Sequence, residues 1–129
     1  MTIAVAHSET RRGEAALRKA ASEALLHGEP LAVLHIVPGV DKPPPANPAL
    51  TEKVAADLAS FPGLTWDVHL GPEGYDTADA LLDLADEVDA SLLVIGSRRR
   101  RPVGKLILGS TVQQVLMKSL IPVLVVKAS

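Results

Sequence analysis

The chain has 129 residues, a formal net charge of −2 at pH 7, and hydrophobic side chains at 47% of its positions. This length fits a single domain, residues 1–129, with enough apolar side chains for a core. The absence of cysteine excludes disulfides, thiolate metal sites and cysteine nucleophiles. The slightly negative charge argues against a general nucleic-acid binder, which usually carries a basic balance or a large basic face.

The first seven residues lack a positively charged start and a long apolar run, so we expect no secretory signal. No apolar stretch approaches the length of about 20 residues that spans a bilayer. These features predict a cytoplasmic protein that has no membrane partner.

Five apolar segments predict strands, in chain order residues 3–6, 31–37, 64–70, 92–95 and 122–126. The second, fourth and fifth are nearly continuous apolar runs, typical of parallel strands buried on both faces. Residues 64–70 alternate between apolar and polar, so we expect this strand at a sheet edge.

Apolar residues at helical spacing fill the gaps, within residues 17–25, 50–61, 81–88 and 112–116. Asn47 and Pro48 are typical of an N-cap followed by proline in the first turn. Gly28 and Gly63 are expected at helix ends with positive φ. Strict alternation predicts an α/β three-layer sandwich with helices on both faces of a five-stranded parallel sheet, Rossmann-like in kind.

With the strand order 3-2-1-4-5, a ligand site is expected where strands 1 and 4 end. Polar residues and glycines follow both strands, at residues 7–10 and 96–99, and Gly109, Ser110 and Thr111 begin the last helix. A helix start offers unpaired N–H groups and favours an anion. The alternative is structural: Gly96 serves only a turn and Ser110 only caps its helix.

The stretch from Val94 to Thr111 resembles the universal stress protein family, whose motif is Gly, two residues, Gly, nine residues, Gly, then Ser or Thr. Gly96, Gly109 and Ser110 fall on the first, third and last motif positions. Residues 86–96 and 119–127 are similar to the family's fourth and closing strands. The similarity extends over nearly the whole chain and is weakest at the Pro-rich connection 41–47.

Two positions depart from the family pattern. Arg99 stands at the middle glycine, and Ser8 stands where the family has an Asp that helps hold a nucleotide. The resemblance implies an adenine nucleotide, ATP or AMP, with Mg²⁺ only if nucleotide phosphates bridge it. The implied nucleotide-binding residues are Ala6, His7, Ser8, Ile36 and Val37 toward the base, and Gly96, Arg98, Arg99, Gly109, Ser110 and Thr111 toward the phosphates.

Four consecutive arginines, residues 98–101, allow three interpretations. They form a solvated basic loop, or they bind a phosphate in place of backbone N–H donors, or they contact nucleic acid directly. Nucleic-acid contact is least favoured, because interleaved aromatic residues and a wider basic surface are missing. The histidines (His7, His27, His35 and His69) fit no common metal spacing, so no metal site is expected. His35 is expected to be a hydrogen-bonded structural residue.

Catalytic motifs are absent: the serines have no Gly-x-Ser-x-Gly elbow and the chain has no P-loop. We therefore expect a protein without catalytic residues. The favoured function is a stress-response regulator that binds an adenine nucleotide; the alternative is a nucleotide-free dimeric stress protein that acts through protein contacts. An enzyme that uses the same fold on an adenylated intermediate has least support. A homodimer through residues 122–127 is expected, because the last strand would otherwise be an exposed sheet edge.

Overall fold

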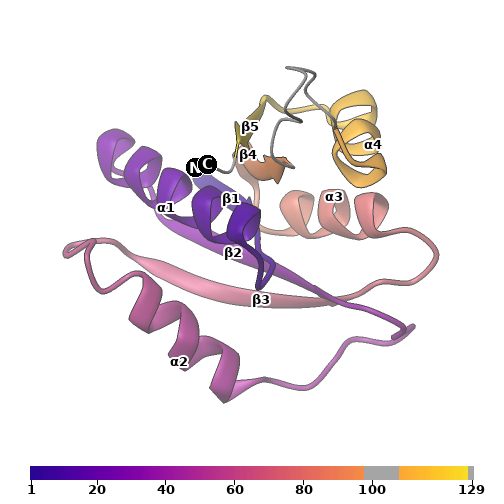
Figure 1. The fold of residues 1–129 in the computed structure, drawn as a ribbon, viewed down its shortest axis with the longest axis horizontal. Helices are drawn as coiled ribbons and strands as arrows, with labels where there is room; N and C mark the ends of the chain where they lie inside the picture. The colour runs from indigo at the N-terminus through magenta and orange to yellow at the C-terminus, as the bar shows by residue number, and fades with distance from the viewer. Residues whose placement is uncertain (98–107, 128–129) are drawn as a thin grey trace.

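The computed structural model describes residues 1–97 and 108–127, in which strands and helices alternate along the chain (Figure 1). The elements are β1 (Thr2–Ala6), α1 (Arg11–His27), β2 (Leu31–Val37), α2 (Pro48–Asp57), β3 (Trp66–Pro72), α3 (Thr77–Glu87), β4 (Ala90–Ser97), α4 (Ser110–Lys118) and β5 (Val123–Lys127). The strands form one parallel sheet in the order β3-β2-β1-β4-β5. The predicted fold and strand order are confirmed.

Every predicted strand except β2 shifts by one or two residues at one or both ends: β1 begins one residue earlier, β4 extends two residues further at each end, and β3 and β5 move toward the carboxyl terminus. β3 runs from Trp66 to Pro72 rather than over 64–70, because Leu31 of β2 pairs with Trp66. Leu64 belongs to the preceding turn, where its N–H donates to the carbonyl of Phe61. Residue 122 precedes β5 but still accepts a hydrogen bond from the N–H of Leu93. β3 does lie at a sheet edge, as its alternating pattern predicted.

The sheet carries a separate apolar core on each face. Side chains from α1 and α2 pack with Ile3, Val5 and Val33 on one face, whereas α3 and α4 pack with Ala4 and Leu34 on the other. Neighbouring residues of a strand point to opposite faces, which is why near-continuous apolar runs serve both cores. The arrangement of two helices per face follows from this division.

The predicted apolar stripes extended too far at two helices. Leu25 of α1 is 40% exposed and Leu116 of α4 is 42% exposed, so both lie at the borders of the buried faces. None of the helices in the described ranges is long and apolar enough to cross a membrane.

Asn47 and Gly28 lie at helix ends as predicted, whereas α2 already ends at Asp57 and Gly63 lies in the turn before β3, so its predicted place at a helix end is wrong. The side chain of Asn47 accepts a hydrogen bond from the N–H of Leu50 and caps α2, with proline in the first turn. Gly28 ends α1 in a left-handed conformation, φ 65°, and Gly63 has φ 86°. These φ values suit glycine because it has no Cβ.

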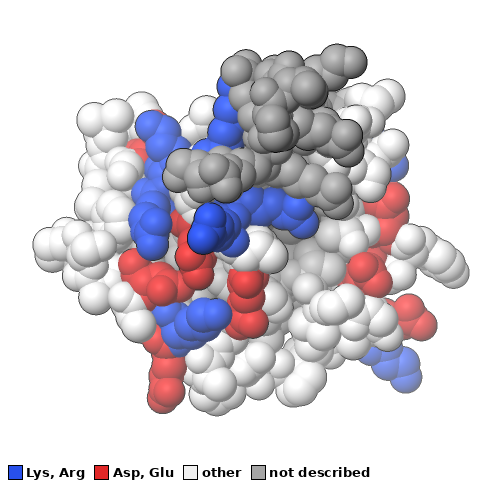
Figure 2. Space-filling view, viewed as in Figure 1, with Lys and Arg blue, Asp and Glu red and all other residues white. Residues whose placement is uncertain are grey.

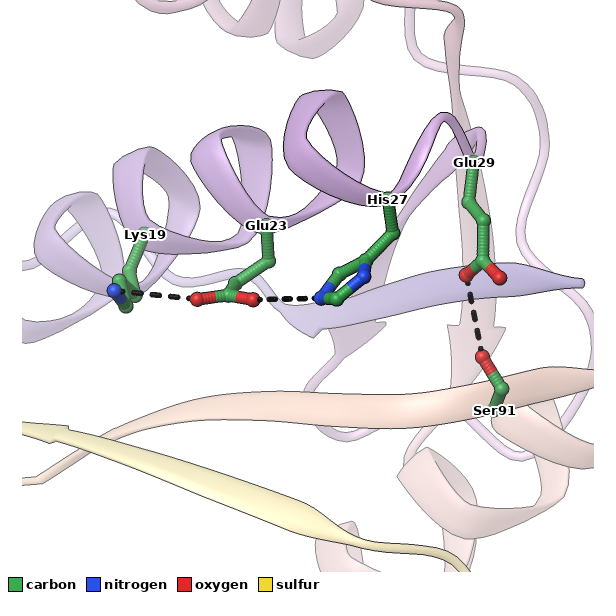
Figure 3. A network of polar contacts seen from close by, with 5 residues as sticks. All are labelled: Lys19, Glu23, His27, Glu29 and Ser91. Atoms are coloured by element: carbon green, nitrogen blue, oxygen red, sulfur yellow. Dashed lines mark hydrogen bonds and ion pairs between the residues drawn. The ribbon is translucent and has the colours of Figure 1, made fainter.

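Two groups of polar contacts lie along α1 and at the amino end of the sheet, opposite the strand ends that face the predicted site (Figure 3). The carboxylate of Glu23 lies between Lys19 and His27, each 3.2 Å away on the same face of α1. Glu29, which follows α1, accepts a hydrogen bond from the hydroxyl of Ser91 in β4 at 3.3 Å. This contact connects the loop before β2 to the start of β4.

Candidate functional site

A cavity of about 330 Å³ lies at the carboxyl ends of the central strands, where β1 and β4 run side by side. This is the position at which parallel α/β sheets usually bind ligands. Residues from β1, β2, β4, α1, α3 and α4 surround it: Ala6, His7, Ser8, Arg12, Gly13, Ile36, Pro38, Glu73, Thr77, Leu81, Ile95, Gly96, Gly109, Ser110, Thr111 and Val112.

Most residues predicted for the site do line this cavity, namely Ala6, His7, Ser8, Ile36, Gly96, Gly109, Ser110 and Thr111. Val37 is not among the lining residues. Ile36 packs on the face covered by α3 and α4, and the next residue of a strand points to the other face. Pro38 lines the cavity in place of Val37. Arg98 and Arg99, with the rest of the four-arginine run, lie outside the described residues.

The sequence analysis missed the part of the cavity lining that comes from the first turn of α1 and from the segment between β3 and the middle of α3. It includes Arg12 and Gly13 from α1, and Glu73, Thr77 and Leu81 from the β3–α3 segment. None of these belongs to a recognisable motif. Only Gly13 gave a signal, as a glycine in the first turn of the helix after strand 1.

The turn from β1 into α1 is closely packed. The hydroxyl of Thr10 caps α1 by accepting from the N–H of Gly13 at 3.2 Å, and it also contacts the hydroxyl of Ser8 at 2.9 Å. A Cβ on Gly13 would lie 2.1 Å from the carbonyl oxygen of Ser8, so only glycine fits. The Ser8 hydroxyl therefore takes part in the helix-capping contacts at this corner of the cavity.

Gly96 is needed for helix packing. A Cβ at this position would lie 2.2 Å from the carbonyl oxygen of Arg12, so the space left by the missing side chain is filled by α1. The resemblance implies Gly96 as a phosphate-binding residue; it does line the cavity, but the space that its missing side chain leaves is taken by α1. Gly109 differs, because nothing lies within 4 Å of its would-be Cβ and a ligand can approach there.

The start of α4 differs from the starts of the other helices. Side chains of Thr10, Asn47 and Asp76 cap α1, α2 and α3, whereas Gly109 occupies the N-cap of α4 with no side-chain cap hydrogen bond. The alternative that Ser110 caps its own helix is therefore wrong, since Ser110 is the first helical residue. Backbone N–H groups in a first turn lack partners within the helix and favour an anion. In α4 this turn borders the cavity.

His7, which is buried, and His35, which is half-buried, form a pair beside the cavity. Their Nδ1 atoms are 3.0 Å apart, and their ring centroids are 5.1 Å apart. Burial is the main cause that lowers the pKa of each imidazole, and for His7 the neighbouring His35 lowers it further. His35 is thus a hydrogen-bonded structural residue, as predicted. His7 directs its Nδ1 at His35 while also lining the cavity.

A carboxylate lies at the β3 side of the cavity. Glu73 accepts from the N–H of Gly39 at 3.1 Å and from the hydroxyl of Thr77 at 2.9 Å. The hydrogen bond from Gly39, followed by that from Thr77, lowers the pKa of Glu73. The side chain thus connects the loop after β2 to the first turn of α3.

The charge around the site is mixed. In Figure 2, Lys and Arg gather on the α1 side of the molecule, with Asp and Glu among them. Within residues 1–97 and 108–127, no group of three His, Asp or Glu side chains is placed to hold a metal ion.

Comparison with known proteins points to one family. Residues 1–127 match the Universal stress protein family. A universal stress protein of Thermus aquaticus is 33% identical over 98% of both chains. Two universal stress proteins of Mycolicibacterium smegmatis are 54% and 30% identical, over 43% and 96% of this chain respectively. These matches span 43% and 47% of the Mycolicibacterium smegmatis proteins, so the chain spans about half their length.

Solved structures of relatives agree. The universal stress protein from Archaeoglobus fulgidus is 33% identical, with a TM-score of 0.75 and coverage of 98% of this chain and 97% of that one. An Archaeoglobus fulgidus universal stress protein in complex with dAMP is 28% identical, with a TM-score of 0.69 and coverage of 98% and 96%. With the same strand order and the cavity at the same topological position as predicted, the chain belongs to the universal stress protein family.

Proposed function

We propose that the chain is a cytoplasmic stress-response regulator that binds an adenine nucleotide, ATP or AMP, in this cavity and has no catalytic residues of its own. The observation that carries the proposal is the uncapped start of α4, which borders the cavity at Gly109, Ser110 and Thr111. Mg²⁺ would enter only as an ion bridged by the nucleotide phosphates.

The cavity has the polarity that a nucleotide needs. The α4 start provides an anion-favouring side, and Arg12, which also lines the cavity, belongs to a residue type that matches phosphate geometry well. Ala6, Ile36 and Leu81 provide apolar surface for a purine. A volume of about 330 Å³ is within the range of small-molecule sites, roughly 300–1,000 Å³.

The comparison with the Archaeoglobus fulgidus protein supports an adenine nucleotide as the ligand class, since that relative was solved in complex with dAMP. Its 28% identity extends over nearly the whole chain. The mixed charge over α1 in Figure 2 favours a small anion over a nucleic acid, because nucleic-acid surfaces are usually broadly basic.

Isothermal titration calorimetry with ATP, AMP and cyclic AMP tests the proposal, with ATP titrated in the presence and absence of Mg²⁺. We expect micromolar binding of at least one of the three nucleotides. The absence of heat with all three at millimolar concentration would overturn the proposal.

Replacing Ser110 with Ala tests the phosphate end of the site. The loss of one neutral hydrogen bond should weaken binding by about 0.5–1.5 kcal/mol, and by more if the acceptor is charged. Ser22→Ala is the matched control, because Ser22 is an exposed residue of α1 outside the cavity lining. Equal affinities of both variants and the unmodified chain would remove Ser110 from the site.

The second candidate is a nucleotide-free dimeric stress protein that acts through protein contacts. Ser8 favours it, because this residue replaces the family's Asp and its hydroxyl contacts Thr10 at the start of α1. Arg99 at the family's middle glycine favours it as well. A protein that gives no heat with any nucleotide, yet sediments as a dimer, would match this candidate.

A further inference from the structure

Glu73 is the one carboxylate among the described residues that line the cavity. It follows β3, whereas the start of α4 follows β4, and β2 and β1 lie between these two strands in the sheet. The cavity thus has a carboxylate on one side and the anion-favouring helix start on the other. A ligand with a phosphate at α4 would extend its uncharged part toward Glu73.

The carboxylate of Glu73 keeps free acceptor capacity. One oxygen accepts from the N–H of Gly39 and the other from the hydroxyl of Thr77. An ionised carboxylate offers about four lone-pair positions, so these two bonds leave about half of them unused. Both bonds stabilise the charged form and lower the pKa of Glu73, so the group is an anion at neutral pH.

Glu73 is also held in place before any ligand arrives. Its backbone N–H donates to the carbonyl of Val37 at 3.2 Å, and the next residue, Gly74, donates to Val40 at 3.1 Å. Main-chain and side-chain bonds therefore hold the loops after β2 and β3 together at the cavity rim. A side chain fixed by several bonds loses little further freedom on binding, which favours it as a specificity residue.

We propose that Glu73 accepts hydrogen bonds from the nucleoside part of the bound nucleotide and selects for ligands that present donors there. The inference rests on the proposed nucleotide-binding function. The donors are either the ribose hydroxyls or the exocyclic amine of adenine. In this chain Glu73 would provide a carboxylate that Ser8, at the family's Asp position, does not.

Two variants distinguish a contact between Glu73 and the ligand from a structural role in which its hydrogen bonds to Gly39 and Thr77 brace the loops after β2 and β3. Glu73→Gln keeps an amide oxygen for the Gly39 N–H and an amide NH₂ that can donate to the Thr77 hydroxyl, so both braces survive while the charge is lost. Thr77→Val removes one brace and leaves the carboxylate in place. Circular dichroism and thermal unfolding of both variants verify that each one folds, and Glu73→Asp provides a second variant if Glu73→Gln does not.

The titrations use three ligands: AMP, 2′,3′-dideoxy-AMP, which lacks both ribose hydroxyls, and inosine monophosphate, which lacks the exocyclic amine. The unmodified chain should bind AMP about tenfold to a hundredfold more tightly than one of the two analogues, as expected for a hydrogen bond to a charged acceptor. The analogue that binds weakly identifies the donor. Glu73→Gln should abolish the preference for AMP over that analogue. Thr77→Val should weaken the binding of all three ligands by a similar factor and should retain the preference.

The contrary outcomes are distinct. If the unmodified chain binds none of ATP, AMP and cyclic AMP, the proposed function fails and this inference fails with it. If AMP binds but the chain shows no preference, or Glu73→Gln and Thr77→Val act alike on all ligands, Glu73 only braces the loops. In that case the nucleotide site stands and the role of Glu73 is overturned.

Discussion

The imidazoles of His7 and His35 restrict each other's protonation. With their Nδ1 atoms 3.0 Å apart, one nitrogen donates and the other accepts, so both cannot carry a proton there. Other charged groups that act on His7 are Glu9, which follows β1, and Lys53 and Asp57 on α2. Burial dominates over these charges and lowers the pKa of both imidazoles.

This pair predicts a loss of stability in mild acid. Both imidazoles have pKa values below 6.5 in the folded chain, the value for a free imidazole, so between the two values the unfolded chain binds more protons. The free energy of unfolding should therefore be highest above pH 6.5 and fall as the pH decreases below it. Urea unfolding at pH 7.5 and 5.5 measures the difference.

The double variant His7→Gln/His35→Gln should show a smaller loss between these two pH values. His27→Gln, which changes an exposed imidazole on α1, should retain the loss of the unmodified chain. A double variant with an unchanged pH dependence would show that other groups cause it.

At the scale of elements, the contact between α1 and β4 sets the width of the site. The carbonyl of Arg12 lies directly against Gly96, so the first turn of α1 approaches the end of β4 more closely than any side chain would allow. The same turn carries Gly13 against Ser8 at the end of β1. Two glycines therefore determine how near α1 lies to the strand ends that form the cavity.

Gly96→Ala should destabilise the fold, because its Cβ would lie 2.2 Å from a backbone oxygen that can move only with α1. Forcing extra atoms into a packed site costs about 1–3 kcal/mol. Gly109→Ala is the matched control: its Cβ meets nothing within 4 Å, and its φ of −68° suits alanine. Alanine is a weaker N-cap than glycine, so this variant should lose less than about 1 kcal/mol. Urea unfolding compares them, and equal losses would contradict the packing role of Gly96.

At the scale of the whole molecule, the exposed edge at β5 is the expected dimer contact. β5 pairs with β4 on one side, and its sequence Val123–Lys127 is apolar up to the last residue. An apolar edge strand offers unpaired N–H and C=O groups to a second copy. Residues 122–127 thus remain our predicted homodimer interface.

Sedimentation at micromolar concentration should give twice the mass of one chain, and Val125→Pro should give a monomer. The N–H of Leu93 donates to the carbonyl of Pro122. With parallel pairing, Leu124 then continues the ladder to β4 and Val125 directs its N–H outward. Proline at an edge removes that outward donor with little harm to the sheet. A monomer for the unmodified chain would rule out the dimer.

The sequence alone determined the order of elements and the position of the cavity. The spacing of apolar residues along the chain can be read without tertiary contacts. It predicted buried strands from the near-continuous apolar runs at β2, β4 and β5, and an edge strand from the alternating run near β3. Asn47 and Gly28 marked helix ends because their local chemistry suits those backbone geometries, whereas Gly63 marked a turn beyond the end of α2. The glycine and hydroxyl residues after β1 and β4 placed the cavity, since carboxyl ends of parallel strands share one edge.

Only the tertiary structure decided which further side chains complete that cavity. Arg12 and Thr77 reach it because α1 and α3 pack across the sheet, and Glu73 reaches it because hydrogen bonds join the loops after β2 and β3. No local pattern encodes either arrangement. The packing role of Gly96 also came only from the structure, because the Arg12 carbonyl oxygen that occupies the space of its missing side chain is 84 residues away in the chain. Long-range packing determines such contacts, and residue spacing along the chain does not reveal them.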